Sequence, residues 1–495
     1  MSEVEKATTE TAAVESRDPG LVLIRSRSLL IGLASTTVGG GVAGFIVALL
    51  FGVQAGFSQP LATFLAGAGA LSAGVLAYVN GERTRDLTKR QHELDTKRER
   101  ERHQADMDRE RERHAEDSRR EQVSTLRDRY TAIAGQIADD SAAIRQAGVY
   151  ALTALADDWH AFGEDDERQV CINLLQWYLR VPFPQPGEDE PPTLSEREIR
   201  QTIVGILTQR RHRPPDDPKS WSTTAIDLHH VSLPNCVLTK FDLTKFDLHG
   251  ANLGGADLRS ADLTGANMDG AYLHSANLHG TDMTGTDLHG ADLHGADIVG
   301  ATLSKADLIG ADMVDADLSG ANLDSASLDG ADLTDAILVD ATLIGAKLDG
   351  ARLGRADLGG ASLGGADLHR ADLQSADLHR ADLDSTSLFD AHLNGADLTD
   401  ANLRSANLFR VDLTAANLTR AHLKGADLSG ANLTRAHLEN ADLRGAHLDG
   451  ADLTGANLHN ADLNGAHLNG ANLDGVVYGE NTRWPEGFTP PQRES

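Results

Sequence analysis

A strict five-residue period governs half of this sequence, from residue 226 to residue 475. Every fifth residue from Leu228 to Leu473 is leucine, with four exceptions of similar size and polarity: Met268, Met283, Met313 and Ile298. The residue two places before each leucine is small, and from residue 251 onward it is nearly always alanine. No insertion interrupts the register. An uninterrupted internal repeat predicts one short structural unit that recurs and stacks on its neighbours.

A period of five fits neither regular secondary structure. A helix face needs apolar residues about 3.6 apart and a strand face needs them two apart. The pattern instead predicts a chain that turns at a fixed point in every unit. We number the unit so that the small residue is position 1 and leucine is position 3. These two positions should point inward, while positions 2, 4 and 5 point outward. Glycine is common at position 5, where the turn is expected.

This unit, Ala-(Asp/Asn)-Leu-X-X, resembles the repeat of the pentapeptide-repeat family. The resemblance implies a right-handed, four-sided β-helix with one unit per side and four units per coil. At about 4.8 Å per coil, roughly 12 coils would form a rod of about 60 Å. One unit buries only a leucine and an alanine, so stability should come from stacking, as in other solenoids. The expected interior leaves no room for a catalytic pocket.

The composition points to a basic protein partner. The formal net charge is −29, and about −22 of it falls between residues 226 and 475. Such a surface repels nucleic acid and attracts basic proteins, so direct nucleic-acid binding is not expected. The two cysteines, Cys171 and Cys236, cannot form a disulfide framework and favour a reducing compartment.

Two apolar stretches near the N-terminus predict a membrane hairpin over residues 21–80, after a disordered tail over residues 1–20. Residues 29–52 and residues 61–79 carry no charge and are long enough to cross the lipid bilayer as helices. Basic residues flank the pair, which predicts a multi-pass protein of the cell membrane with both termini and the rod in the cytoplasm. The alternative is a buried helical hairpin of a soluble domain.

Charged and then amphipathic segments separate this hairpin from the repeat. Residues 81–130 alternate acids and bases with few apolar residues, which favours a lone helical spacer over a coiled coil or a nucleic-acid arm. Residues 131–215 contain three stretches with helical periodicity and predict a small helical domain that caps or tethers the rod. Within it, Ala143–Leu152 resembles the HEAT-like helical segment found ahead of actinobacterial pentapeptide arrays.

The expected fold is therefore α+β in several parts: a two-helix membrane hairpin, a long charged helix, a small helical domain and a right-handed quadrilateral β-helix over residues 221–480. Residues 481–495 should form a C-terminal cap and tail. Three aromatic residues, Tyr478, Trp484 and Phe488, resemble the closing motif of several pentapeptide-repeat proteins. We expect them to cover the last coil and its open strand edges.

The outward positions offer one candidate contact surface and no predicted chemistry. Phe389 and Phe409 are 20 residues apart at position 4, so they should lie on one face, with Ile309 further along it. Histidines also recur at this spacing, as at His447 and His467, but they are spread over several faces, so no metal site is predicted. We find no phosphate loop, nucleophile elbow, CxxC or HExxH motif. The sequence predicts neither an enzyme nor a cofactor.

Two functions fit these observations. The first is a membrane-tethered, non-catalytic scaffold whose rod binds a protein partner in the cytoplasm, with homo-oligomers left open. The second follows from the family resemblance, because some pentapeptide-repeat proteins imitate DNA, bind DNA gyrase and protect it from quinolones. This chain differs from those smaller soluble dimers in its expected membrane hairpin and in its longer array.

Overall fold

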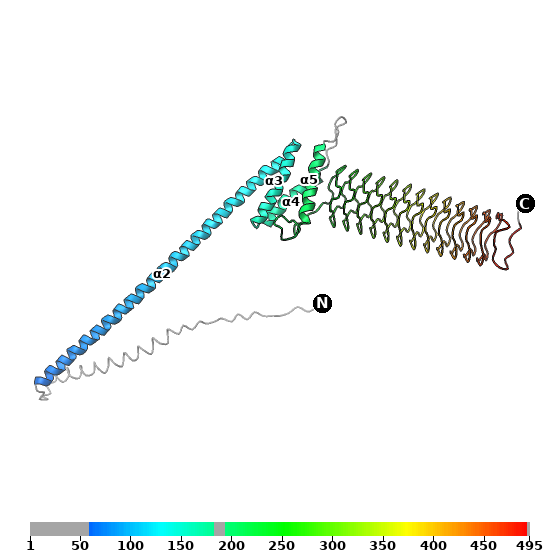
Figure 1. Ribbon diagram of the computed structural model, residues 1–495. Helices are drawn as coiled ribbons and strands as arrows, with labels where there is room; N and C mark the ends of the chain where they lie inside the picture. The colour runs from blue at the N-terminus through cyan, green and yellow to red at the C-terminus, as the bar shows by residue number, and fades with distance from the viewer. Residues whose placement is uncertain (1–58, 183–193, 493–495) are drawn as a thin grey trace, which may run out of the picture. The chain divides into compact units, whose positions relative to one another are not determined.

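The computed structural model describes residues 59–182 and 194–492, and only the backbone of residues 59–66, 68, 194 and 195. Within these ranges four helices precede the repeat: α2 (Gln59–Ile137), α3 (Ala142–Ala161), α4 (Asp165–Arg180) and α5 (Leu194–Arg211). The repeat then forms a stack of coils that continues almost to the C-terminus (Figure 1). The chain divides into two compact units at Glu116, within α2, and the second unit holds α3–α5 and all the coils.

Helix α2 is 79 residues long and contains the whole predicted charged spacer. Oppositely charged side chains three or four residues apart run along it, such as Arg109 with Asp106 at 3.0 Å and Lys97 with Glu101 at 3.9 Å. Because these side chains are exposed, each pair contributes only about 0.3–0.5 kcal/mol. Sequence-local pairs of this kind support a helix without any partner.

The predicted membrane hairpin is wrong. Among residues 59–182 and 194–492, no helix is both long and apolar enough to cross a membrane, which contradicts the two-span hairpin and the multi-pass membrane location derived from it. The second expected span, residues 61–79, is the beginning of α2, which continues without a break into the charged segment. Nine of its 19 residues are alanine or glycine, which contribute little apolar surface. The first expected span, residues 29–52, lies outside the described residues.

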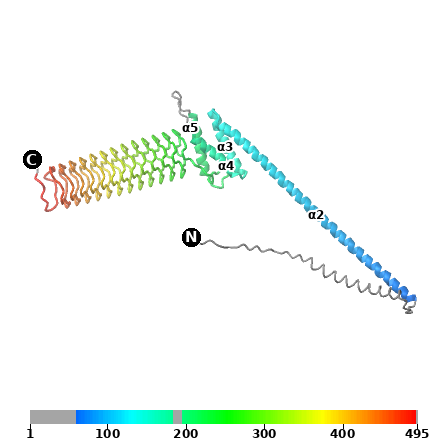
Figure 2. The same cartoon turned by 180° about the vertical axis from the view of Figure 1, so that it is seen from behind.

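The helical domain packs α3, α4, α5 and the end of α2 around a small apolar core. Trp159 of α3, Leu175 of α4 and Ile203 of α5 are at most 1% exposed. Two ion pairs fix the last turns of α2 against this core, between Arg127 and Glu167 at 2.6 Å and between Arg129 and Asp158 at 2.8 Å. Figure 2 shows these helices from behind, next to the first coils.

The repeat forms a four-sided coil of 20 residues, which confirms the predicted solenoid. Position 2 of each unit pairs in parallel with position 2 of the unit 20 residues later, from Ser232 with Asn252 to Asn457 with Val477. The leucines at position 3 and the alanines at position 1 fill the interior, as at Leu363 and Ala361, both fully buried. The core is therefore a continuous column that each coil extends.

Every corner of the coil is a left-handed residue at position 5. Glycine has φ values near +65° there, but lysine, serine, aspartate and arginine take the same conformation, as at Lys305 (φ 60°) and Arg355 (φ 60°). A residue with a Cβ atom costs free energy in this region, on the order of 1 kcal/mol. Stacking therefore enforces the corner geometry even where the sequence does not favour it, so glycine at position 5 is helpful but not required.

The acidic residue at position 2 has a structural role that the sequence analysis missed. Backbone hydrogen bonds between and within coils use the N–H groups of positions 1, 2, 3 and 5. The N–H of position 4 instead donates to the side chain of position 2, as when Thr264 donates to Asp262 Oδ1 at 3.0 Å. Aspartate and asparagine recur at position 2 because a short side-chain acceptor satisfies this remaining donor.

Candidate functional site

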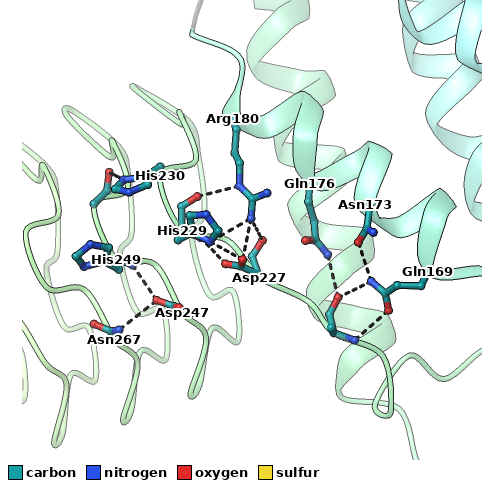
Figure 3. Close-up of polar contacts among 12 residues, drawn as sticks. Gln169, Asn173, Gln176, Arg180, Asp227, His229, His230, Asp247, His249 and Asn267 are labelled. Carbon is teal, nitrogen blue, oxygen red and sulfur yellow. Dashed lines mark hydrogen bonds and ion pairs between the residues drawn. The ribbon is translucent and has the colours of Figure 1, made fainter. Parts of the chain in front are cut away.

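The first coil is closed by side chains of α4. Arg180 donates to the carbonyl oxygens of Asp227 and His229, at 3.1 Å each, and pairs with the Asp227 carboxylate at 3.0 Å (Figure 3). Gln169 and Gln176 both donate to the Ala225 carbonyl, at 2.8 and 3.1 Å. The open edge of the rod thus finds its hydrogen-bond partners in the helical domain.

A buried arginine of α5 completes this junction. Arg200 is 1% exposed and donates to the carbonyl oxygen of Ser232 in the first coil and to that of Leu179 in α4, at 2.6 and 3.2 Å. Glu196, also buried, accepts from Arg200 at 2.8 Å and from Tyr178 at 2.8 Å. Burial and the neighbouring Glu196 carboxylate raise the pKa of Tyr178 to about 12, so this hydroxyl remains a donor.

The C-terminal end is closed by aromatic side chains. Trp484 lies edge-on to Tyr478, with ring centroids 5.2 Å apart, and stacks on Phe488 at 5.4 Å. All three residues pack against the core of the rod and remain partly exposed. Thr482 takes the inward position of the last turn, where its hydroxyl donates to the Leu458 carbonyl at 2.8 Å. These contacts cover the last coil on its apolar side.

Phe389 and Phe409 lie side by side on one face of the rod. Their ring planes are parallel, with centroids 5.5 Å apart, and His369 continues the row 4.8 Å from Phe389. Ile309 is on the same side three coils before His369, so it does not join the pair. Phe389, Phe409 and Ile309 are partly exposed, because each leans on its neighbours along the column.

Charged residues border this aromatic pair. Arg410 pairs with Asp390 at 3.3 Å, and Arg370 pairs with Asp349 at 2.5 Å. The Arg370 guanidinium lowers the pKa of the Asp349 carboxyl through its hydrogen bonds. The aromatic row Phe389–Phe409, together with this charged border, forms a surface that we call the aromatic patch.

Other apolar side chains on the rod are more exposed than the aromatic patch, and the sequence analysis did not single them out. Tyr272 is 57% exposed, Ile344 50% and Ile337 41%. They lie on different sides or coils of the rod and form no continuous surface. A single exposed apolar residue is common on soluble proteins, whereas adjacent aromatic rings are a stronger indication of a contact.

The structure brings titratable side chains together at two places on the rod. One group is His447, Asp449 and His467, and the other is Asp357, Asp377 and His379. Spacing alone had paired His447 with His467, but Asp449 was missed. A cluster joins residues two apart within a unit to residues 20 apart between coils, and only the combined geometry reveals it.

Both cysteines are buried and unreactive by environment. Cys171 lies in α4 and Cys236 at an inward position of the second unit of the first coil, and neither is accessible to solvent. Burial raises the pKa of each thiol to about 12. Thiolate chemistry is therefore suppressed at both positions at neutral pH.

The repeat matches a known protein family. The family model described as pentapeptide repeats matches in eight copies that together extend from residue 224 to residue 477, just over half of the chain. No protein with a curated functional description matches the chain.

Several solved structures are similar over the coils. HetL from the cyanobacterium Nostoc sp. strain PCC 7120, a pentapeptide repeat protein involved in heterocyst differentiation regulation, is 41% identical over 41% of this chain and 86% of HetL, with a TM-score of 0.23. A second pentapeptide repeat protein from Nostoc, alr5209, is 44% identical over 19% of this chain and 77% of its own, with a TM-score of 0.19. QnrB1, a plasmid-mediated fluoroquinolone resistance protein, is 18% identical over 41% of this chain and 92% of QnrB1, with a TM-score of 0.20.

Proposed function

This chain belongs to the pentapeptide-repeat family, and we propose that its rod is a non-catalytic scaffold that binds a basic protein through the aromatic patch. The helical domain holds the first coil in a fixed orientation, because several side chains of α4 and α5 bond to that coil. The rod then acts as a rigid support for whatever its outer faces bind.

The stacked pair Phe389–Phe409 is the observation that carries this proposal. Two parallel rings 5.5 Å apart offer a flat apolar surface in a rod whose outer positions are mostly polar. Aromatic side chains supply large contact areas at low cost in conformational entropy, and they are enriched in protein interfaces. The bordering pairs Arg410–Asp390 and Arg370–Asp349 would form the polar rim of such an interface.

Charge favours a basic partner over a second copy of this chain. The net charge is −29, and about −22 lies on the rod. Two rods approaching through their sides would repel each other, whereas a basic protein would be attracted and steered toward the rod. We therefore expect a partner that presents basic residues around an apolar contact, with affinity that falls as salt concentration rises.

Site-specific cross-linking tests this proposal in the full chain. A photo-crosslinking amino acid replaces Ser429, which is one coil beyond Phe409 in the same column, or Thr419, which is at position 4 on the opposite side. We expect one basic protein to be captured at Ser429 and not at Thr419. The same protein, once purified, should bind the chain less tightly at high salt and lose binding when Phe389→Ser and Phe409→Ser are combined.

A matched control separates the patch from apolar residues in general. Val299 and Val339 occupy position 4 on the opposite side of the rod and are also partly exposed. Val299→Ser with Val339→Ser should leave binding unchanged. Equal capture from both sides, unaltered binding by the double phenylalanine variant, or capture of only a second copy of this chain would each contradict the proposal.

The acidic coils keep DNA imitation as the second candidate function. Residues 311–340 contain eight aspartates and neither lysine nor arginine, the densest run of negative charge on the rod. A DNA-like rod would bind gyrase through charge rather than through the aromatic patch. This alternative predicts that the full chain inhibits gyrase supercoiling at micromolar concentration, equally for wild type and for the combined Phe389→Ser and Phe409→Ser variant. No inhibition would exclude it.

A further inference from the structure

Two histidines and one aspartate converge on one side of the rod near its C-terminal end. His447 and His467 both occupy position 2, one coil apart, and their ring centroids are 4.5 Å apart. Asp449 follows His447 by two residues. One ligand atom from each of the three side chains lies within 4.8 Å of the other two.

The two imidazoles are not used by the fold. Position 2 ordinarily carries the acceptor for the N–H of position 4, but the histidines leave this role to another residue. The N–H of Asn469 donates instead to Asp449 Oδ1 in the preceding coil at 3.2 Å, and Asn469 Nδ2 donates to the same oxygen at 2.8 Å. Both rings are exposed, so their nitrogens are accessible from solvent.

The same two hydrogen bonds orient the carboxylate. They occupy Asp449 Oδ1, and within the described part of the chain no hydrogen bond involves Oδ2. A carboxylate held through one oxygen presents the other to a ligand in a restricted direction. Hydrogen bonding of this kind to a metal-binding carboxylate commonly sets its orientation and strengthens the site.

We propose that His447, His467 and Asp449 bind one divalent transition-metal ion, with Zn²⁺ as the best-suited ion. Two imidazole nitrogens and one carboxylate oxygen are donors that Zn²⁺ accepts, with bonds of about 2.0–2.2 Å. Donors around a tetrahedral ion with such bonds lie roughly 3.4 Å apart. Small rotations of three side chains would bring the present donors to that separation, and water would complete the coordination.

The second group of side chains is a weaker candidate because the fold already uses its donors. Asp377 Oδ1 accepts the N–H of His379 at 3.0 Å and contacts His379 Nδ1 at 2.8 Å. Asp357 Oδ1 accepts the N–H of Gly359 at 3.0 Å. Metal binding there would break contacts that cap the backbone, whereas binding at His447 and His467 breaks none.

A third pair of histidines provides an internal control. His274 and His294 stack with ring centroids 5.2 Å apart and planes 6° apart, a spacing close to that of the proposed site. In the described ranges, no third histidine, cysteine or carboxylate joins them within ligand distance. Two stacked imidazoles without a carboxylate should bind Zn²⁺ much more weakly than three converging donors.

Metal titration of the full chain tests the proposal, with any polyhistidine tag removed. Zn²⁺ binding is followed by calorimetry and Co²⁺ binding by its visible absorption at neutral pH. We expect His467→Asn to remove one equivalent of tight Zn²⁺ and the corresponding Co²⁺ band. Asparagine occurs at position 2 in neighbouring units such as Asn457 and Asn472, so this variant should fold normally.

The role of Asn469 is tested separately, as a positioning residue. Asn469→Thr retains the backbone N–H bond to Asp449 but removes the side-chain donor, and we expect about tenfold weaker Zn²⁺ binding. His274→Asn with His294→Asn should change nothing. The proposal is overturned if wild type and His467→Asn bind Zn²⁺ alike, if the His274 and His294 variant loses the same equivalent, or if neither ion binds at micromolar concentration. Thermal unfolding without metal confirms that each variant is folded.

Discussion

The two ends of the rod are closed by different chemistry. At the first coil, Arg180 and Arg200 bond to carbonyl oxygens that have no preceding coil to pair with. At the last coil, the Trp484 ring and its aromatic neighbours cover apolar area, and much of this cover remains exposed. Any stacked structure exposes unpaired backbone groups at its ends. The comparison indicates that buried polar contacts secure the N-terminal end and apolar contacts the C-terminal end, so the former should be more sensitive to substitution.

The largest effect is expected at Arg200. Arg200→Leu leaves the Glu196 carboxylate and two carbonyl oxygens buried without their donor. Breaking a buried ion pair by removing one partner costs about 3–5 kcal/mol. Guanidinium unfolding followed by fluorescence of Trp159 and Trp221, both buried in the helical domain, measures this loss. Arg352→Leu is the control, since its ion pair with Asp332 is exposed and should contribute about 0.5 kcal/mol. Equal losses in both variants would break the proposed difference between the ends.

A smaller effect is expected at Trp484. Trp484→Ala removes a partly exposed ring that stacks between Tyr478 and Phe488. Full burial would predict a larger cost, and we expect about 2 kcal/mol, confined to the last coils. Amide hydrogen exchange should accelerate in residues 456–477 and remain unchanged in α4 and α5. Acceleration that spreads to the helical domain would mean that the two ends are energetically coupled.

Within the stack, a third kind of contact replaces the position 2 acceptor. The N–H of Ile344 has no acceptor in its own unit, where position 2 is Thr342, and donates to Asp324 Oδ1 in the preceding coil at 2.9 Å. Asp324→Ala should therefore cost about 1 kcal/mol, the free energy of one hydrogen bond. Asp384→Ala is the matched control, because Arg404 in the next coil donates to its own Asn402. Hydrogen exchange at Ile344 measures the effect, and identical protection in wild type and Asp324→Ala would refute it.

Acid should weaken the rod, with the smallest single-residue effects. Hydrogen bonds from Arg444 lower the pKa of the Asp442 carboxyl, and those from Arg259 lower that of Asp257. A carboxyl whose pKa is lower in the folded state stabilises the fold above the ordinary pKa of about 3.9, and this stabilisation is lost as the pH falls through the folded value. Thermal unfolding between pH 5 and pH 2 tests this. Arg444→Met should flatten the dependence slightly, and a steeper dependence in that variant would contradict the assignment.

The repeat was predictable because its period leaves one way to bury a leucine at every fifth residue. The role of Asp262 and its equivalents was not predictable by the same reasoning, since the unpaired N–H of position 4 is visible only in the coil geometry. The membrane hairpin failed because the alanine and glycine of residues 61–79 read as apolar, while the helix continues into charge.

The candidate site was predictable only in part. Spacing by 20 placed Phe389 beside Phe409, because one coil separates them. It could not find Asp449 beside His467, since those residues are 18 apart and come together through a side-chain position that differs from unit to unit. The junction residue Arg200 carried no sequence signal, because an arginine in an amphipathic helix is usually exposed.

The central claim is that 20 residues advance the rod by one coil, so that residues 20 apart share a face. Spin labels at Val299→Cys and Thr419→Cys, six coils apart on one side, test this by double electron–electron resonance. The buried thiols of Cys171 and Cys236, with pKa values raised to about 12, should resist labelling. The account predicts a narrow distance distribution near 29 Å, at about 4.8 Å per coil. A broad distribution, or one centred far beyond that distance, would contradict it.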